Sequence, residues 1–349
     1  KTRSQRSHSR THRELLVASI MASSVKISDP VLLQARNLKK YFSAESSNYS
    51  RSSQTVRALD GVSFTLREGE TLGLVGESGC GKSTAARTVL RLTEPTAGEV
   101  YFRGQNLFEL SHNDLRSLRK EMQIIFQDPY ASLNPRKRVR DILEEPFDIH
   151  RFVDGKERNE RVAWLMERVG LSADQGEKYP HEFSGGQLQR VGIARAIALH
   201  PRLVVADEPV SALDVSIRAQ VINLLLDLKE SMAISYLFIS HDMAVVRHFC
   251  DRIAVMYLGK IVELANSTQL YSTPQHPYTE ALLQAIPRMD PGSKKQRLKV
   301  RGDLPSAIDP PKGCAFQTRC PISEKRCEES IPPLKEIGSG HHAACFLRN

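Results

Sequence analysis

Nine consecutive residues in the first quarter of the chain have the types and spacing of a phosphate-binding loop. They are Gly76, Glu77, Ser78, Gly79, Cys80, Gly81, Lys82, Ser83 and Thr84, and they fit G-x-x-x-x-G-K-[ST]. Glycines let successive backbone N–H groups point inward at phosphate oxygens. The pattern places Lys82 to reach the β- and γ-phosphates of a nucleotide, and the Ser83 hydroxyl to bind Mg²⁺. The alternative is a glycine-rich turn that binds nothing, but a chance match has a probability of only about one in a hundred at this length.

The stretches around this loop have the character of the strands and helix that would hold it. Thr71–Val75 is short and apolar like a buried strand, and Ala85–Leu90 favours a helix whose N-terminus points at the same anion. A second apolar strand, Leu203–Ala206, ends at Asp207 and Glu208. An acidic pair at such a position is more often a helix cap when it stands alone. Downstream of a phosphate loop, we expect Asp207 to hold Mg²⁺ and Glu208 to orient and deprotonate an attacking water.

Two more polar side chains directly follow apolar strands. Gln127 comes after residues 123–126, and His241 comes after residues 236–239 with one serine between. Either residue alone would usually be structural. Because the same sheet can aim both at one γ-phosphate, we expect them to join the catalytic site, with Gln127 also a ligand of the Mg²⁺ ion beside Ser83 and Asp207.

A serine–glycine run marks a second candidate anion site. It consists of Ser184, Gly185, Gly186 and Gln187, which open a helical stretch through Leu199. The run combines a hydroxyl, exposed backbone N–H groups and a helix N-terminus. In isolation it would be a capped helix after a loop. A nucleotide already held by one phosphate loop needs no second cradle, so this one is expected to serve a nucleotide bound by another subunit.

Taken together, these motifs resemble those of the ATP-binding cassette (ABC) family over residues 31–265. In order, the matching positions are Tyr41, Gly76–Thr84, Gln127, Ser184–Gln187, Leu203–Glu208, Ser211–Asp214 and His241. The resemblance implies an α/β P-loop NTPase fold with a mixed sheet and a helical subdomain at about residues 129–190. It also implies ATP and Mg²⁺ as cofactors, and a head-to-tail dimer with two ATP molecules between the subunits. Tyr41 would stack on the adenine, and Asp214 would contact the partner.

Further stretches are similar to the ATPase subunits of oligopeptide and dipeptide importers. They are residues 127–136, 274–279 and 313–321. This similarity implies ATP hydrolysis that powers peptide import through two separate membrane permease subunits, with a second, different ATPase subunit and an external peptide-binding protein. It places the chain at the cytoplasmic face of the inner membrane. The alternatives are a non-transport ABC ATPase acting on nucleic acid or ribosomes, a regulatory cassette, or an importer of nickel or glutathione.

Four of the six cysteines lie in the last 36 residues: Cys314, Cys320, Cys327 and Cys345. Their spacing, C-x5-C-x6-C-x17-C, lacks the close pairs typical of structural zinc and suits an iron–sulfur cluster better. The importer resemblance implies the same [4Fe–4S] cluster. Zinc is the second interpretation, helped by His341 and His342, and free or disulfide-bonded cysteines are the third.

Bulk composition sets the remaining limits. The net charge is +9, but residues 1–20 alone carry +4, and the remaining +5 indicates no nucleic-acid partner. No apolar run approaches the ~20 residues that cross a bilayer.

From the clustered basic charge we expect a disordered basic segment at residues 1–30, which is an upstream extension or a transit peptide. A nucleotide-binding domain follows at residues 31–265, and residues 266–349 form a separate Pro-rich extension with the cysteines.

Overall fold

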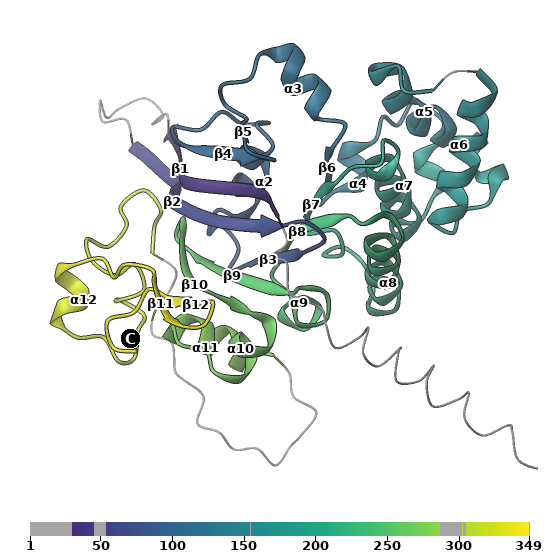
Figure 1. Cartoon of the computed structure of the whole chain (residues 1–349). Helices are drawn as coiled ribbons and strands as arrows, with labels where there is room; N and C mark the ends of the chain where they lie inside the picture. The colour runs from purple at the N-terminus through teal and green to yellow at the C-terminus, as the bar shows by residue number, and fades with distance from the viewer. Residues whose placement is uncertain (1–29, 45–53, 154, 287–301, 303–304, 349) are drawn as a thin grey trace, which may run out of the picture.

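The computed structural model describes residues 30–44, 54–153, 155–286, 302 and 305–348. The basic segment expected at residues 1–30 lies outside this part of the chain apart from its last residue. The fold is the mixed α/β P-loop architecture that the sequence predicts (Figure 1).

An eight-stranded mixed sheet carries the candidate site. Five strands run parallel: β6 (Met122–Ile125), β7 (Leu203–Asp207), β8 (Ser235–Ser240), β3 (Thr71–Val75) and β9 (Arg252–Tyr257). The sheet continues antiparallel through β10 (Lys260–Asn266), β12 (His341–Ala343) and β11 (Lys335–Gly338). Parallel neighbours bring their carboxyl ends to one edge, where ligands bind in such folds.

Both faces of the parallel strands are buried, which explains their continuous apolar sequences. In β8, Tyr236 and Phe238 belong to one hydrophobic core, and Leu237 and Ile239 belong to another. Successive side chains of a strand point to opposite faces, so one strand supplies both cores. Burial on both faces therefore fixes the strands, and with them the positions of the residues that follow each strand.

A second, antiparallel sheet lies beside the first (Figure 1). Its order is β2 (Gln54–Arg67), β1 (Val31–Ala44), β4 (Ala97–Phe102) and β5 (Gln105–Asn106). Helix α2 (Lys82–Val89), which follows the phosphate loop, contacts strands of both sheets. Helix α3 (His112–Leu118) leads from this sheet into β6.

Helices cluster beside the β6 and β7 edge of the main sheet, as expected for residues 129–190 (Figure 1). They are α4 (Pro129–Ser132), α5 (Val139–His150), α6 (Gly155–Arg168), the two 3₁₀ turns Ala173–Glu177 and Pro180–Glu182, and α7 (Gly185–Ile197). On α6 the apolar residues at helical spacing, Val162, Leu165 and Met166, are buried. Helix α8 (Val215–Met232) packs on α7, and α9 (Met243–Phe249) packs on β3 and β8.

The C-terminal region is joined to the main sheet. It contains α10 (Ser267–Ser272), α11 (Pro277–Gln284) and α12 (Lys325–Glu329). Strand β12 pairs with β10, and its residues Ala343 and His342 lie opposite Glu263 and Leu264. Glu263 is fully buried, and its Oε1 lies 2.7 Å from His341 Nε2. The expected boundary at residue 265 therefore falls within a continuous sheet.

Candidate nucleotide-binding and hydrolysis site

The phosphate loop has the backbone geometry that its glycines allow. Gly76 and Gly81 have φ angles of 154° and 108°. A Cβ at either position would lie 2.2 Å from a backbone carbonyl oxygen, Met256 O for Gly76 and Ala58 O for Gly81. Only glycine fits there. The loop is thus wedged between β9 and β2.

Lys82 is held inside the loop and is only 4% exposed. Its Nζ donates hydrogen bonds to the backbone oxygens of Gly76 at 2.9 Å and of Glu77 at 3.0 Å. Helix α2 begins at Lys82 behind Gly81, which provides no side-chain cap for its first N–H groups. A buried ammonium and uncapped helix N–H groups at one place form a suitable anion cradle.

The pair expected to hold Mg²⁺ is assembled. Ser83 Oγ donates to Asp207 Oδ1 at 2.9 Å and so joins the phosphate loop to the end of β7. Burial raises the pKa of the Asp207 carboxyl above its ordinary value, although the hydrogen bond from Ser83 lowers it. A nearby cation would favour the ionised form. Both groups are hard oxygen donors of the type that Mg²⁺ takes, so these residues fit the ion.

Glu208 brings the three expected catalytic side chains together. Its Oε2 accepts a hydrogen bond from Gln127 Nε2 at 3.1 Å and lies 3.2 Å from His241 Nδ1. These residues follow β6, β7 and β8, three adjacent parallel strands. Glu208 has a φ of 47°, the left-handed region that costs a non-glycine residue about 1 kcal/mol or more. Such strain persists where the surroundings fix a residue, as they do here between Gln127 and His241.

Lys82, Ser83 and the three expected catalytic side chains line one pocket of about 720 Å³, and Asp207 lies behind Ser83 without lining it. Its lining residues are Val56, Ala58, Ser78, Gly79, Gly81, Lys82, Ser83, Thr84, Gln127, Glu208, Ser211, Ala212, His241 and Ala307. The pocket is large enough for a nucleotide triphosphate, and its walls carry both the anion cradle and the acid–base groups.

The serine–glycine run lies elsewhere. Ser184 caps α7: its Oγ accepts from Gln187 N at 3.4 Å, and Gln187 Oε1 accepts from Ser184 N at 3.0 Å. Ser184, Gly186 and Gln187 line a different pocket from the phosphate loop. Asp214 is the N-cap residue of α8 and lines neither pocket.

Tyr41 is not among the residues that line the nucleotide pocket. Its hydroxyl donates to Asp60 Oδ1 at 2.7 Å, and the Arg57 guanidinium lies 5.9 Å from its ring. The neighbours of Arg57 on β2, Val56 and Ala58, do line the pocket. The hydrogen bond to Asp60 holds the ring in place, and its contact with adenine stays a prediction.

Sequence reasoning missed the contributions of the C-terminal region to this site. Ala307 lines the nucleotide pocket, and its carbonyl oxygen accepts from Arg57 N at 3.1 Å. Tyr278 Oη accepts from Glu77 N at 2.8 Å, and Arg319 forms an ion pair with the Glu77 carboxylate. No pattern in the sequence links positions more than 200 residues apart, so these contacts appear only in the fold.

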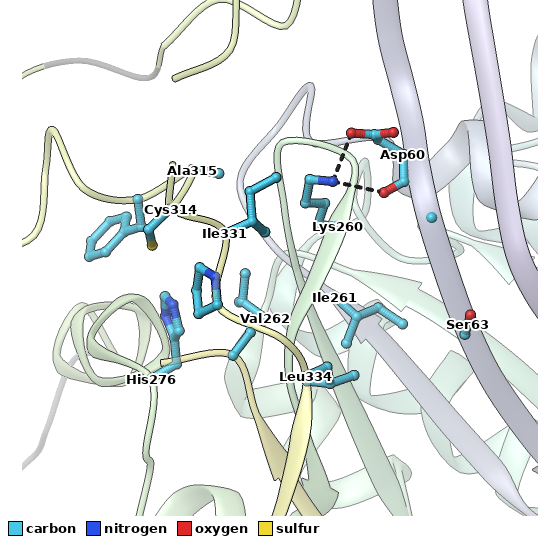
Figure 2. A pocket seen from close by; sticks show the side chains of 14 residues that line it. Asp60, Ser63, Lys260, Ile261, Val262, His276, Cys314, Ala315, Ile331 and Leu334 are labelled. Carbon is cyan, nitrogen blue, oxygen red and sulfur yellow. Dashed lines mark hydrogen bonds and ion pairs between the residues drawn. The ribbon is translucent and has the colours of Figure 1, made fainter. Parts of the chain in front are cut away.

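A cavity of about 360 Å³ is lined by residues of both the cassette and the C-terminal region (Figure 2). Lys260 on β10 donates to the Asp60 carboxylate on one side, while His276, Cys314 and Ile331 line the other. It is distinct from the nucleotide pocket, although Asp60 also holds Tyr41.

The four late cysteines are brought together but are not placed as a single-ion site. All four line one small pocket with Phe316 and His276, and the Cys314 amide donates to the Cys327 carbonyl at 2.7 Å. In the described part of the chain, no group of three or more His, Cys, Asp or Glu side chains is spaced to hold a metal ion. The zinc interpretation therefore gains no support, and the placement alone does not establish a cluster. All six cysteines are free rather than disulfide-bonded.

Comparisons with known proteins agree with the fold. The ABC transporter family profile matches residues 59–211, and the profile of the oligopeptide/dipeptide transporter C-terminal region matches residues 262–327. The dimeric ATP-binding cassette MJ0796, solved bound to ADP and Pi, is 29% identical, with a TM-score of 0.60 over 67% of this chain and 98% of its own. CbiO1 of Clostridium perfringens, part of the ABC transporter complex CbiONQ, is 25% identical, with a TM-score of 0.60 over 70% and 92%. The fold is that of an ABC cassette, a family of ATP-hydrolysing proteins.

Curated relatives define the family more narrowly. The oligopeptide transport ATP-binding protein AppF of Bacillus subtilis is 55% identical over 90% of this chain and 97% of its own length. The dipeptide transport ATP-binding protein DppF of Haemophilus influenzae is 52% identical over 93% and 99%. The chain belongs to the ATP-binding subunits of oligopeptide and dipeptide ABC transporters. The alternative of a nucleic-acid ATPase is not favoured by any of these matches.

No helix among the described residues is both long and apolar enough to cross a membrane.

Proposed function

We propose that this chain hydrolyses MgATP to power the import of peptides through separate membrane subunits. The observation that carries the proposal is the meeting of Gln127, Glu208 and His241 at the phosphate loop, in a chain whose C-terminal region matches the peptide-transporter profile. The experiment is to reconstitute the chain with its membrane subunits and follow ATP-dependent peptide uptake. An assembly that hydrolyses ATP without moving peptides would overturn the transport assignment.

In the proposed binding step the loop holds the nucleotide phosphates. Lys82 exchanges its two carbonyl partners for β- and γ-phosphate oxygens, and the free N–H groups at the start of α2 point at the same charge. Ser83 and Asp207 would hold Mg²⁺, which neutralises phosphate charge when bound. Tyr41 is proposed to pack on the adenine beside Val56 and Ala58.

In the proposed hydrolytic step Glu208 holds the attacking water and accepts its proton. Its carboxylate lies within hydrogen-bond reach of Gln127 and His241, which fix its orientation. His241 is then placed to contact the γ-phosphate, and Gln127 to report its presence to the membrane subunit. In-line attack on the γ-phosphorus breaks its bond to the β–γ bridging oxygen, giving ADP and phosphate.

The proposed assembly pairs this chain with a second ATPase subunit. Ser184, Gly186 and Gln187 line a pocket separate from the phosphate loop, which supports a role on the partner's nucleotide. We propose a different ATPase as the partner, two permease subunits, and a peptide-binding protein acting through them. Association with those permeases would place the chain at the cytoplasmic face of the membrane.

The four cysteines are proposed to hold a [4Fe–4S] cluster. The proposal is supported by the shared pocket that all four soft thiol ligands line. A bound cluster would cross-link segments around Cys314, Cys320, Cys327 and Cys345, a region with few apolar residues of its own. ATP-driven transport needs no redox step, so the proposed role is structural.

A further inference from the structure

The cysteine-containing region reaches the phosphate loop through one ion pair. Arg319 Nη1 donates to Glu77 Oε2 at 2.8 Å, and Nη2 donates to Oε1 at 3.1 Å. The two parallel bonds form the forked arrangement that makes guanidinium–carboxylate pairs strong and directional. The Arg319 side chain is 12% exposed and that of Glu77 is 33% exposed, so the pair is partly buried and solvent screens it less than a fully exposed ion pair.

Glu77 is held at its backbone as well as its carboxylate. Its N–H donates to Tyr278 Oη at 2.8 Å, and its carbonyl oxygen accepts from Lys82 Nζ at 3.0 Å. The residue before it is Gly76, and the residue after it, Ser78, lines the nucleotide pocket. Before a nucleotide binds, a movement of Glu77 therefore shifts the hydrogen-bond partner of Lys82 and the neighbouring pocket residue Ser78.

Arg319 is itself fixed by a tight turn between two cysteines. Within residues 314–320, Arg319 N donates to Phe316 O at 3.0 Å, and Cys320 N donates to Gln317 O at 3.3 Å. Phe316 is buried, meets the Tyr257 ring edge-on at 5.3 Å, and lies 5.4 Å from the Tyr278 ring. The turn therefore packs directly on the tyrosine that holds the Glu77 amide.

A carboxylate in a phosphate-binding loop carries the same sign of charge as the ligand. Unpaired, it would repel the nucleotide, and the repulsion would weaken as salt increased. The Glu77 carboxylate raises the pKa of Arg319 above its ordinary value, so the guanidinium stays charged. Arg319 thus neutralises the charge of Glu77, which is the one acidic residue in the phosphate loop.

We propose that Arg319 is a positioning residue for the nucleotide: by neutralising and anchoring Glu77, it makes the C-terminal region a determinant of MgATP affinity. This inference rests on the proposed nucleotide site. A second contact of the C-terminal region with the site does not involve Arg319. Ala307 lines the nucleotide pocket, and its carbonyl oxygen accepts a hydrogen bond from Arg57 N. The C-terminal region therefore meets the site at two separate points.

The test is the dissociation constant of MgATP for the full chain at low and high salt. Arg319→Ala should raise it by about five- to twentyfold at low salt, and by less at high salt. Adding Glu77→Gln to Arg319→Ala should restore most of the lost affinity, because no unpaired carboxylate remains. Arg319→Lys, which keeps the charge but not the fork, should lose less than Arg319→Ala and keeps the test available if that variant folds poorly.

The matched control is Arg348→Ala, which removes another ion pair of this region, with Glu280, far in sequence from the loop. Its affinity for MgATP should equal that of the parent chain. Unchanged affinity in Arg319→Ala would overturn the proposal, as would a loss that Glu77→Gln does not relieve or that ignores salt. Lys82→Ala distinguishes a failure of the Arg319 proposal from a failure of the proposed nucleotide site. If Lys82→Ala also binds MgATP normally, the nucleotide site itself is misassigned.

Discussion

The Nδ1 atom of His241 lies 3.2 Å from Oε2 of Glu208, although the two residues follow different strands and are 33 positions apart. The carboxylate is 12% exposed, whereas the imidazole, which lines the same pocket, is 58% exposed. The largely buried Glu208 carboxylate is therefore held next to an exposed imidazole, that of His241, which lines the same pocket. This arrangement predicts different defects for changes at the loop and at the carboxylate.

Glu208→Gln should slow ATP hydrolysis by about a hundredfold or more, since the amide cannot accept the water's proton. Because Lys82, Ser83 and Asp207 remain, MgATP should still bind, and a closed dimer should accumulate. Turnover and equilibrium binding measured side by side check this. Glu94→Gln, at an exposed carboxylate, is the control. Near-parental turnover in Glu208→Gln would rule out Glu208 as the base.

Ser184→Ala should lower turnover only in the assembled transporter, because its helix terminus serves the ATP held by the partner subunit. MgATP binding to the isolated chain should be unaffected. Ser111→Ala is the matched control, since Ser111 caps α3 in the same way and lines neither the nucleotide pocket nor the pocket at Ser184. Both changes remove a cap worth about 1 kcal/mol, so stability should fall alike. Equal turnover in the two variants would contradict the partner role.

The folded chain should lose stability on acidification through His276. Burial lowers its pKa to about 3, and its Nδ1 accepts the Tyr278 amide at the start of α11. Below its ordinary pKa of about 6.5, the unfolded chain binds a proton that the folded chain does not. The free energy of unfolding should therefore fall as pH drops from 6.5 toward 3, by up to about 1.4 kcal/mol per pH unit.

Denaturant unfolding of His276→Asn between pH 7 and 5 measures this effect. Asparagine can keep the cap without titrating, so the decline should be shallower than in the parent chain. His112→Asn, at an exposed histidine, should leave the decline as it is. Identical slopes in the parent and His276→Asn would show that His276 does not titrate as proposed.

Anaerobically prepared protein should be brown, with about four irons and four sulfides per chain. Cys320→Ser should bleach it, because one of the four thiolates is lost. MgATP binding should persist, weakened no more than in Arg319→Ala, since Cys320 follows Arg319 directly. Cys250→Ala, which changes a cysteine of the cassette core, should keep its iron. Stoichiometric zinc without iron would defeat the cluster.

The parts of the site that follow strands were predictable from sequence, because the geometry there is local. An apolar strand ending in a polar residue delivers that residue to the sheet edge, and Gln127, Asp207 and His241 lie at or just after the ends of β6, β7 and β8 as this rule predicts. The left-handed backbone of Glu208 was not predictable, since no glycine marks it. It results from tertiary contacts with its two partners.

The role of the C-terminal region could not be predicted in the same way. Its prolines and scattered cysteines suggest a separate unit, yet β12 completes the sheet on β10, and Arg319 reaches Glu77. In these contacts the two partners are separated by between 78 and 242 positions in the sequence. No periodicity or motif relates residues over such separations. The buried Glu263 on β10 shows most clearly that the cassette and the C-terminal region depend on each other. Its carboxylate accepts from His276 N and lies against His341.

Peptide uptake into proteoliposomes containing the complete transporter tests the central claim most directly. With MgATP in the lumen, and the binding protein and labelled peptides outside, the parent complex should accumulate peptide in proportion to ATP hydrolysed. The same complex carrying Glu208→Gln should bind MgATP and accumulate none. Peptide accumulation by the Glu208→Gln complex at the parental rate would contradict the account.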